Sequence, residues 1–245
     1  MIEKILPTGV EYAELFSDPP ELEPHPSEAA LIARAVEKRR REFISVRHCA
    51  RQAMGKLGVD PAPILKGERG VPLFPRGVVG SLTHCDGYRG AVLGYSMAVR
   101  SVGIDAEPHG PLPDGVLDAV SLPAERDWLS TVLNERPAAV SNERPAAVPT
   151  ERPAAAGTDI HWDRLLFCAK EATYKAWFPL THRWLGFEDA HITFALEHSG
   201  PDGTTGTFHS DLLVPGETMS GPPLTSFDGR WLVDDGLVIA AITVQ

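Results

Sequence analysis

We expect an α+β fold made of two halves, each combining helices with a small antiparallel sheet. Helical patterns of apolar residues occur twice, over about 27–57 and 159–178. Each is followed by short apolar segments that are separated by Gly, Pro and Asp turns, which is typical of strands. A chain of 245 residues can bury one large core or two smaller ones. We place the halves at 1–107 and 108–245, with a ligand cleft between them.

The first half opens with a proline-punctuated segment and continues in a long helix. Ser27 is a suitable N-cap for this helix, and Gly58 stands just past its expected end at Leu57. Strands are expected at 78–84, 88–97 and 99–106, and we expect the three to form one small sheet.

The second half should contain a short helix over about 123–133 and a longer one that Pro179 ends. Its strands are expected at 190–196, 206–214, 223–233 and 237–244. Between the two helices lie three near-copies of an eight-residue unit that is rich in Pro and Ala. Because prolines recur there and few bulky residues are present, we expect a flexible loop over about 134–157.

Composition places the chain among ordinary globular proteins, with 43% hydrophobic and 23% charged residues. It contains no apolar run long enough to span a membrane and no signal-peptide pattern, so we expect a cytoplasmic protein without membrane contact. The net charge of −10 does not favour nucleic-acid binding. Cys49, Cys85 and Cys168 are widely separated, which indicates buried thiols rather than disulfides or a zinc site.

An apolar run, Val102–Glu107, ends in two carboxylates. Asp105 and Glu107 are two residues apart, so in a strand they point to the same face. Neighbouring acids raise each other's pKa, and a chain keeps such a pair either fully solvated or bound to a cation. Gly103 would let another backbone approach closely. A solvated strand end and a cation site therefore both fit this stretch.

A second stretch, Phe167–Lys175, adds the residues that favour the cation site. Glu171 and Lys175 are four residues apart and share one face of a helix. If Glu171 reached Asp105 and Glu107, three carboxylates would offer the hard oxygen ligands that suit Mg²⁺. Lys170 and Lys175 would supply positive charge for phosphate groups beside the metal.

Basic residues gather in the first half although the whole chain is acidic. Arg39, Arg47 and Arg51 lie near one flank of the first helix, as a solvated face or as a site for a small polyphosphate. Lys66 and Arg69 belong to a Gly-rich turn, which is either a phosphate-binding nest or a surface hairpin.

The runs Gly103–Glu107 and Lys170–Lys175 match, in this order, the signatures G-[IV]-D-x-E and K-E-[AS]-x-x-K. The chain therefore resembles the Sfp-type phosphopantetheinyl transferase superfamily, and its actinobacterial members most of all. The resemblance extends to Glu42–Arg51, Pro63–Gly67 and Gly80–His84, where the Ser-x-x-His pattern favours an anion contact. It implies two pseudo-symmetric α+β halves with coenzyme A and Mg²⁺, or Mn²⁺, between them. It also implies transfer of 4′-phosphopantetheine from coenzyme A to a serine of an acyl or peptidyl carrier protein, leaving 3′,5′-ADP.

The resemblance also implies a role for each candidate residue. The metal ligands would be Asp105, Glu107 and Glu171. Contacts to coenzyme A would come from Arg39, Arg47, Lys66, Arg69, Ser81, His84, Ala106 (through its backbone), Lys170 and Lys175. Glu171 would take the serine proton, directly or through a metal-bound water, and Lys175 would stabilise charge on the leaving group. The repeat loop departs from the family pattern close to where partners dock.

Trp177–Leu185 is a candidate docking patch for the carrier protein, since it mixes aromatic and basic residues, although Trp177 and Trp184 also suit a core. Two other functions share the same site. A Mg²⁺-dependent hydrolase would cleave coenzyme A or a holo-carrier with water, and a binding module would hold coenzyme A without turnover. We expect a monomer, because two similar halves already complete one cleft.

Overall fold

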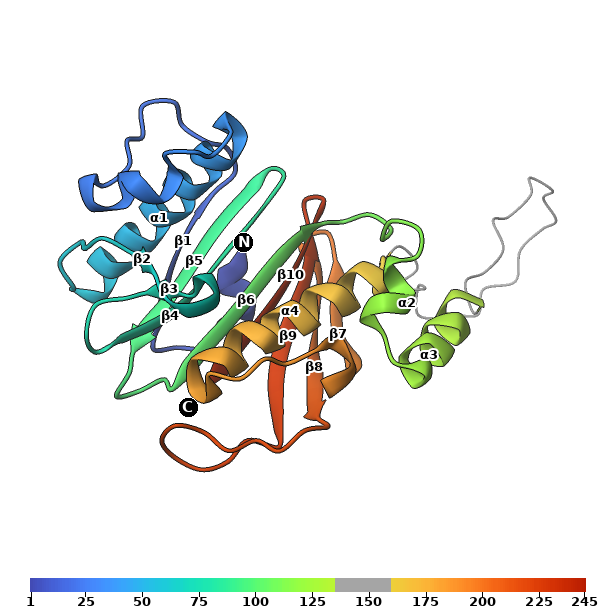
Figure 1. The fold of residues 1–245 in the computed structure, drawn as a ribbon. Coiled ribbons are helices and arrows are strands. Elements are labelled where there is room, and N and C mark those ends of the chain that lie inside the picture. Colours follow the sequence, from blue (N-terminus) through green and yellow to red (C-terminus); the bar gives the residue numbers. More distant parts are fainter. Residues whose placement is uncertain (135–159) are drawn as a thin grey trace, which may run out of the picture.

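The computed structural model describes residues 1–134 and 160–245, so the expected repeat loop lies almost wholly outside the described part. Two antiparallel sheets stand side by side, and each carries one long helix (Figure 1). The helices are α1 (Glu37–Leu57) on the first sheet and α4 (Trp162–Thr181) on the second. This arrangement confirms the predicted α+β class with a helix and a small sheet in each half.

The first sheet has the order β1-β5-β4, with β1 at Val10–Leu15, β4 at Val78–Cys85 and β5 at Tyr88–Tyr95. A two-stranded ribbon, β2 (Leu65–Lys66) and β3 (Pro72–Leu73), follows α1. It encloses the 3₁₀ turn η3 (Glu68–Gly70).

The prediction of a single helix over 27–57 was wrong at its start. Pro26–Ile32 form a 3₁₀ helix, η2, and α1 begins only at Glu37. The side chain of Glu28 is buried and bonds Arg51 of α1, so η2 must fold back against α1 instead of continuing it. The end was predicted correctly, because Gly58 adopts a left-handed φ of 77° that favours glycine.

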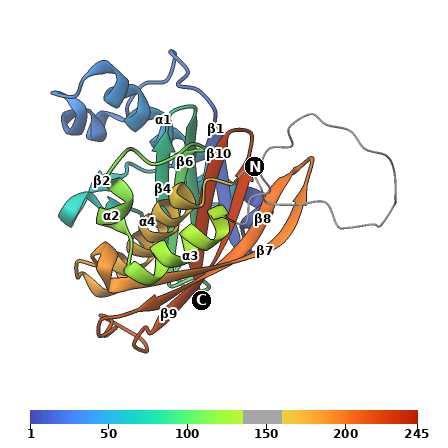
Figure 2. The same cartoon turned by 90° about the vertical axis from the view of Figure 1, so that its right-hand side faces the viewer.

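The second sheet has the order β6-β10-β9-β8-β7. Its strands are β6 (Ser101–Pro108), β7 (Ala190–Gly200), β8 (Gly203–Leu212), β9 (Ser226–Asp234) and β10 (Leu237–Val244). The short helices α2 (Val116–Val120) and α3 (Pro123–Asn134) lie beside α4 on the same side of this sheet (Figure 2). A last short turn, η4 (Phe187–Asp189), leads from α4 into β7.

The expectation that 99–106 completes the first sheet was wrong. β6 pairs with β10, with Asp105 opposite Ala240. Towards the first sheet, β6 meets β4 through side chains: Ile104 N–H donates to Ser81 Oγ (3.1 Å) and Ala106 N–H to Thr83 Oγ1 (3.0 Å). β6 therefore joins the two halves, and a division after residue 107 separates it from the strands with which it pairs.

Gly103 fixes how closely α4 approaches β6. A Cβ atom at this position would stand 2.0 Å from the carbonyl oxygen of Ala172 in α4. Only glycine allows this contact, which brings the face of α4 that carries Glu171 and Lys175 against β6. α4 continues to Thr181, three residues beyond its expected end, because Pro179 removes one backbone hydrogen bond without preventing the last turn.

Apolar cores lie under α1, under α4 and between the two sheets. The core between the sheets combines Tyr88 of β5, Ile104 of β6 and Ile239 of β10 with the N-terminal turn η1 (Ile2–Ile5). The two halves therefore share one buried apolar core, which fixes how they are placed relative to each other. Cys49 and Cys168 are buried as predicted, whereas Cys85 is half-buried. Within the described residues, no helix is long and apolar enough to cross a membrane.

Candidate active site

A cavity of about 420 Å³ lies between the two halves. One wall comes from α1, β4 and the 66–74 segment, and the other comes from α4. The predicted site residues that line it are Arg39, Arg47, Lys66, Arg69, Ser81, His84, Glu171 and Lys175. Two long helices and one strand, distant in sequence, thus bring most of the predicted residues to one cavity.

Asp105 stands where β6 meets α4 and is only 6% exposed. Its Oδ1 accepts hydrogen bonds from Lys175 Nζ (2.7 Å) and Thr83 Oγ1 (3.1 Å). Lys175 Nζ also donates to the carbonyl of Ile104 (3.0 Å). Asp105 Oδ2 is buried and has no hydrogen-bond partner. One carboxylate oxygen is thus held in place, and the other remains able to accept a ligand.

Glu107 and Asp105 both bond side chains of α4, so they point to the same side of β6. This orientation confirms the alternation that their spacing predicted. Its carboxylate accepts a hydrogen bond from Arg164 of α4 (3.1 Å). Burial and the charge of Asp105 raise the pKa of Glu107, against the opposing effect of Arg164. The solvated strand end is therefore excluded. Sequence reasoning missed Arg164, although it stands seven residues, about two helical turns, before Glu171 on the same helix.

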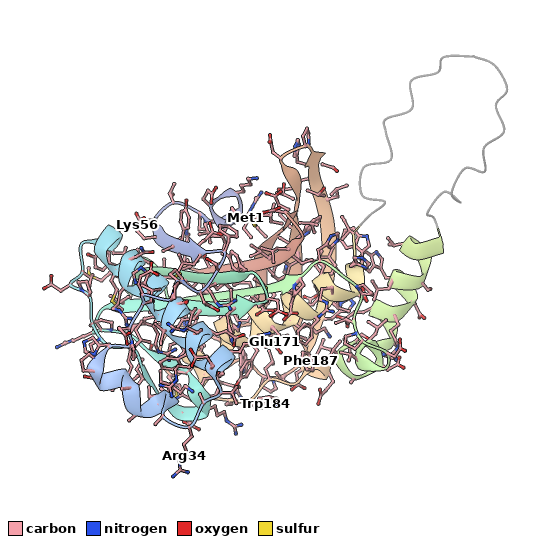
Figure 3. All side chains as sticks on the ribbon, turned by 90° about the horizontal axis from the view of Figure 1, so that it is seen from above. Met1, Arg34, Lys56, Glu171, Trp184 and Phe187 are labelled. Atoms are coloured by element: carbon pink, nitrogen blue, oxygen red, sulfur yellow. The ribbon has the colours of Figure 1, made fainter. Side chains whose placement is uncertain are left out.

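Glu171 completes the acidic group from α4. Figure 3 shows it near the middle of the molecule, between the blue helices of the first half and the green α3. Burial and the charge of Asp105 raise the pKa of Glu171, while Lys175 opposes the shift. Burial disfavours the charge on Lys175, but Asp105 and Glu171 outweigh it, so the pKa of Lys175 is raised. Lys175 stays protonated at neutral pH and shares its charge between the acids.

The three carboxylates do not form a closed metal shell as they stand: within the described ranges, no group of three or more His, Cys, Asp or Glu side chains is placed to hold an ion. The chemistry of the donor set nevertheless fits a hard cation. Asp105 Oδ2 is buried without a partner, and the charge of Asp105 raises the pKa of both glutamates. A bound cation would relieve both conditions.

The opposite wall of the cavity is basic and organised around one aromatic ring. The guanidinium of Arg47 lies 3.4 Å from the centre of the Phe43 ring, and its Nε donates to the carbonyl of Ile64 (3.0 Å). Lys66 Nζ lies 5.5 Å from the same ring. Burial lowers the pKa of Arg47 to about 10, so it remains charged at neutral pH. Burial and the charge of Arg47 also lower the pKa of Lys66.

Arg39 and His84 form the edge of this basic wall. Arg39 contacts the ring nitrogen Nε2 of His84 and also pairs with Glu42 (3.3 Å). Burial, and then the charge of Arg39, lower the pKa of His84 to about 4. His84 is therefore neutral at pH 7, and an anion that entered beside it would raise its pKa again.

Three predicted contacts to coenzyme A have other partners in the structure or stand apart from the cavity. Lys170 is buried in an ion pair with Glu125 (2.8 Å), because adjacent residues on a helix point about 100° apart and Glu171 takes the cavity side. Ala106 does not line the cavity, and its N–H is bonded to Thr83. Ser81 lines the cavity, and its Oγ accepts the Ile104 N–H.

The Trp177–Leu185 segment divides between core and surface. Trp177 is fully buried, whereas Trp184 is 60% exposed. Arg183 is already engaged, since it pairs with Glu217 (3.2 Å). The guanidinium of Arg69 lies 5.7 Å from the Trp184 ring, so this tryptophan stands beside the cavity mouth and connects the two halves.

Comparison with known families agrees with the two signatures. Residues 27–94 match the model of the 4′-phosphopantetheinyl transferase N-terminal domain, and residues 101–201 match that of the 4′-phosphopantetheinyl transferase superfamily. The chain belongs to the 4′-phosphopantetheinyl transferase superfamily. The chain is therefore a transferase. The first family match ends shortly before β6, and the second begins at the first residue of β6.

Three relatives are similar over nearly all of this chain and most of their own length. The 4′-phosphopantetheinyl transferase Npt of Nocardia iowensis is 58% identical over 99% of both chains. The 4′-phosphopantetheinyl transferase PptT of Mycobacterium tuberculosis is 59% identical over 100% of this chain and 98% of its own. The 4′-phosphopantetheinyl transferase Svp of Streptomyces mobaraensis is 46% identical over 100% of this chain and 89% of its own. The predicted closeness to actinobacterial members of the superfamily is thus confirmed.

Proposed function

We propose that this enzyme transfers 4′-phosphopantetheine from coenzyme A to a serine of an acyl or peptidyl carrier protein, with Mg²⁺, and releases 3′,5′-ADP. One observation carries the proposal. Glu171 and Lys175 line one wall of a cavity whose opposite wall is basic and aromatic. Behind them, Lys175 is bonded to Asp105, whose charge raises the pKa of both Glu107 and Glu171. A diphosphate ester with a nucleotide at one end suits this distribution of charge. The names of the relatives point to the same group transfer.

The basic wall would bind the nucleotide part of coenzyme A. Arg47 is held by Ile64 and Phe43 before any ligand enters, so little side-chain freedom is lost on binding. Lys66, Arg39 and Arg69 would add charge around the phosphates, and His84 would take part as a hydrogen-bonding neutral ring.

The acidic group would hold the metal ion, with Asp105, Glu107 and Glu171 as the ligands. When bound, Mg²⁺ would neutralise negative charge on the diphosphate that the serine must approach. Lys175 would donate to the same phosphate oxygens and stabilise the charge that gathers on the leaving 3′,5′-ADP. Mn²⁺ is a suitable substitute, because it also prefers oxygen ligands.

Glu171 would accept the proton of the attacking serine. The raised pKa of Glu171 makes its carboxylate a stronger base than an ordinary glutamate, as a general base near neutral pH requires. Glu171 also lines the cavity that the serine would enter.

The test is intact-mass spectrometry of an apo-carrier protein incubated with the enzyme, coenzyme A and Mg²⁺. We expect the carrier to gain one 4′-phosphopantetheine group while 3′,5′-ADP appears in equal amount. Release of the same nucleotide without carrier would indicate the hydrolase instead. Tight binding of coenzyme A without any product would indicate a binding module.

A further inference from the structure

Two glutamates outside the cavity are completely buried, and they occupy corresponding places in the two halves. The side chains of Glu28 and Glu125 are both 0% exposed. Glu28 precedes α1, and Glu125 in α3 precedes α4. Buried carboxylates are rare unless they are paired, so each needs an explanation from its contacts.

Glu28 ties α1 to the segment that follows it. Its Oε1 accepts from Arg51 of α1 (2.9 Å) and from the N–H of Ile64 (2.7 Å). The carbonyl of Ile64 in turn accepts from Arg47 (3.0 Å). Ile64 is therefore held at both its N–H and its C=O, immediately before the Leu65–Lys66 strand that leads to Arg69. This arrangement sets where the cations of the basic wall stand.

Glu125 does the same for α4. Its Oε2 pairs with Lys170 of α4 (2.8 Å), and its Oε1 accepts from the N–H of Ile192 in β7 (2.8 Å). Lys170 also donates to the carbonyl of Phe187 (2.7 Å). The segment from Trp184 to Phe187 is thereby held beside Glu171, where it lines a smaller cavity of about 110 Å³. In Figure 3, Trp184 and Phe187 are both labelled below Glu171.

The two sets of contacts correspond in the kinds of partner, although Glu28 binds both partners through Oε1 and Glu125 uses both of its oxygens. In each half a buried glutamate binds a cation of the long helix and an N–H of the segment after that helix. The segments held in this way meet where Arg69 lies over Trp184, at 5.7 Å. Together they border both the larger cavity and the smaller one.

We propose that Glu28 and Glu125 are positioning residues of the transfer reaction. Glu28 holds Arg47 and the Lys66–Arg69 segment for the phosphates of coenzyme A, and Glu125 holds the Trp184–Phe187 segment against Glu171. The proposal rests on the proposed function. A buried ion pair is a weak source of stability, since apolar residues often replace it without loss, so placement of the two segments is the better reason for these charges.

The test is a comparison of kcat and KM for Glu28→Gln and Glu125→Gln in the carrier-modification assay. The amide keeps the shape of the side chain but does not neutralise the buried cation. For Glu28→Gln we expect KM for coenzyme A to rise about tenfold with kcat within about twofold, a loss confined to binding. For Glu125→Gln we expect kcat to fall about tenfold with KM for coenzyme A within about twofold.

Glu14→Gln is the matched control. The Glu14 side chain is only 8% exposed and pairs with the N-terminal amino group (2.8 Å). It also accepts from the N–H of Ile2 (3.0 Å) and the hydroxyl of Tyr88 (2.7 Å), but it does not line either cavity. It should lower the melting temperature and leave both constants unchanged for the folded enzyme. If Glu28→Gln and Glu125→Gln behave like this control, with activity lost only in proportion to folded protein, the proposal is overturned.

A second pair of variants covers the case in which the Glu28→Gln and Glu125→Gln proteins do not fold. Arg51→Gln and Lys170→Gln remove the cation of each pair, and we expect the same changes in KM and in kcat, respectively. Unchanged constants in both would also overturn the proposal. Calorimetric binding of coenzyme A distinguishes failure of this proposal from failure of the proposed function. If the wild-type enzyme had no transfer activity, the proposed function would be refuted. Binding of coenzyme A that is about tenfold weaker in Glu28→Gln than in wild type would still support the positioning role of Glu28.

Discussion

Asp105 of β6 links the strand to two of its neighbours, β4 and α4. One oxygen is held by Lys175 and Thr83, and the other is buried without a partner. Its charge also raises the pKa of Glu107 and Glu171. Removing this charge would leave Lys175 short of its counterion and leave the proposed metal short of a ligand at the same time.

We therefore expect Asp105→Asn to reduce kcat/KM for carrier modification by more than about 100-fold, the scale typical of losing a group that stabilises charge in the transition state. The amide has the same shape, so the fold should be kept, which circular dichroism would check. Arg69→Gln removes an exposed cation and should raise KM for coenzyme A only a few-fold. An Asp105→Asn enzyme that keeps near-normal transfer would contradict these roles.

His84 should make the stability of the protein depend on pH. Burial and Arg39 lower the pKa of His84 from 6.5 to about 4 in the folded state. Between these values the unfolded chain binds a proton that the folded chain does not, so the free energy of unfolding should fall as pH decreases from 6.5 to 4. Because the side chain is partly exposed, we expect a loss of about 1–2 kcal/mol from this residue.

Urea unfolding at several pH values would measure this loss. In His84→Gln, the free energy of unfolding should depend less on pH between 4 and 6.5. A wild-type curve with the same slope as that of the variant would show that His84 is not kept neutral by its surroundings. Coenzyme A should raise the pKa of His84, so proton uptake on binding between pH 4 and 6.5 is an independent check.

Among the elements, the contact between β6 and α4 determines the geometry of the site. Gly103, Asp105 and Glu107 point towards α4, and the missing Cβ of Gly103 lets the helix come close enough for Lys175 to reach Asp105. The position of the acidic group thus depends on a residue that carries no chemistry.

Gly103→Ala should push α4 away from β6, since the added Cβ would stand 2.0 Å from the Ala172 carbonyl. We expect a loss of about 1–3 kcal/mol in the free energy of unfolding, as for overpacked cores, together with reduced transfer activity. Gly110→Ala is the matched control, because no atom lies within 4 Å of its added Cβ. Equal stability and activity of the two variants would refute the close contact.

The elements also show what local sequence patterns predict. The alternation in 102–107 and the spacing of Glu171 and Lys175 pointed to the candidate site, because side chains two apart in a strand or four apart in a helix share a face. The break between η2 and α1 was not predictable, since it depends on Glu28 reaching Arg51 and Ile64, which are distant in sequence. For the same reason no local pattern showed that β6 pairs with β10. The burial of Lys170 was not predicted, because its partner, Glu125, lies on another helix.

At the scale of the whole molecule, the two halves are joined along β4 and β6 by hydroxyl groups in place of a strand ladder. Thr83 accepts from Ala106 N–H and donates to Asp105, so the same side chain connects the sheets and orients the carboxylate. The site between the halves is therefore sensitive to this junction.

Thr83→Val replaces the hydroxyl by a methyl group of similar size. It should leave the buried Ala106 N–H without a partner and cost about 1–3 kcal/mol in stability. Because Asp105 also loses a donor, kcat should fall, whereas KM for coenzyme A should change little. Guanidinium unfolding would test the expected loss of stability, and steady-state kinetics would test the expected fall in kcat. An unchanged kcat would show that the Thr83 contacts between the halves do not affect catalysis.

The central claim is that Asp105 and Glu107 of the strand signature and Glu171 of the helix signature bind the same divalent ion in the presence of coenzyme A. Mn²⁺ titration followed by electron paramagnetic resonance measures this directly. We predict one Mn²⁺ bound per wild-type chain with coenzyme A present, no binding at this site in Asp105→Asn, and weakened binding in Glu171→Gln. Mn²⁺ binding that is unchanged in both variants would contradict the account.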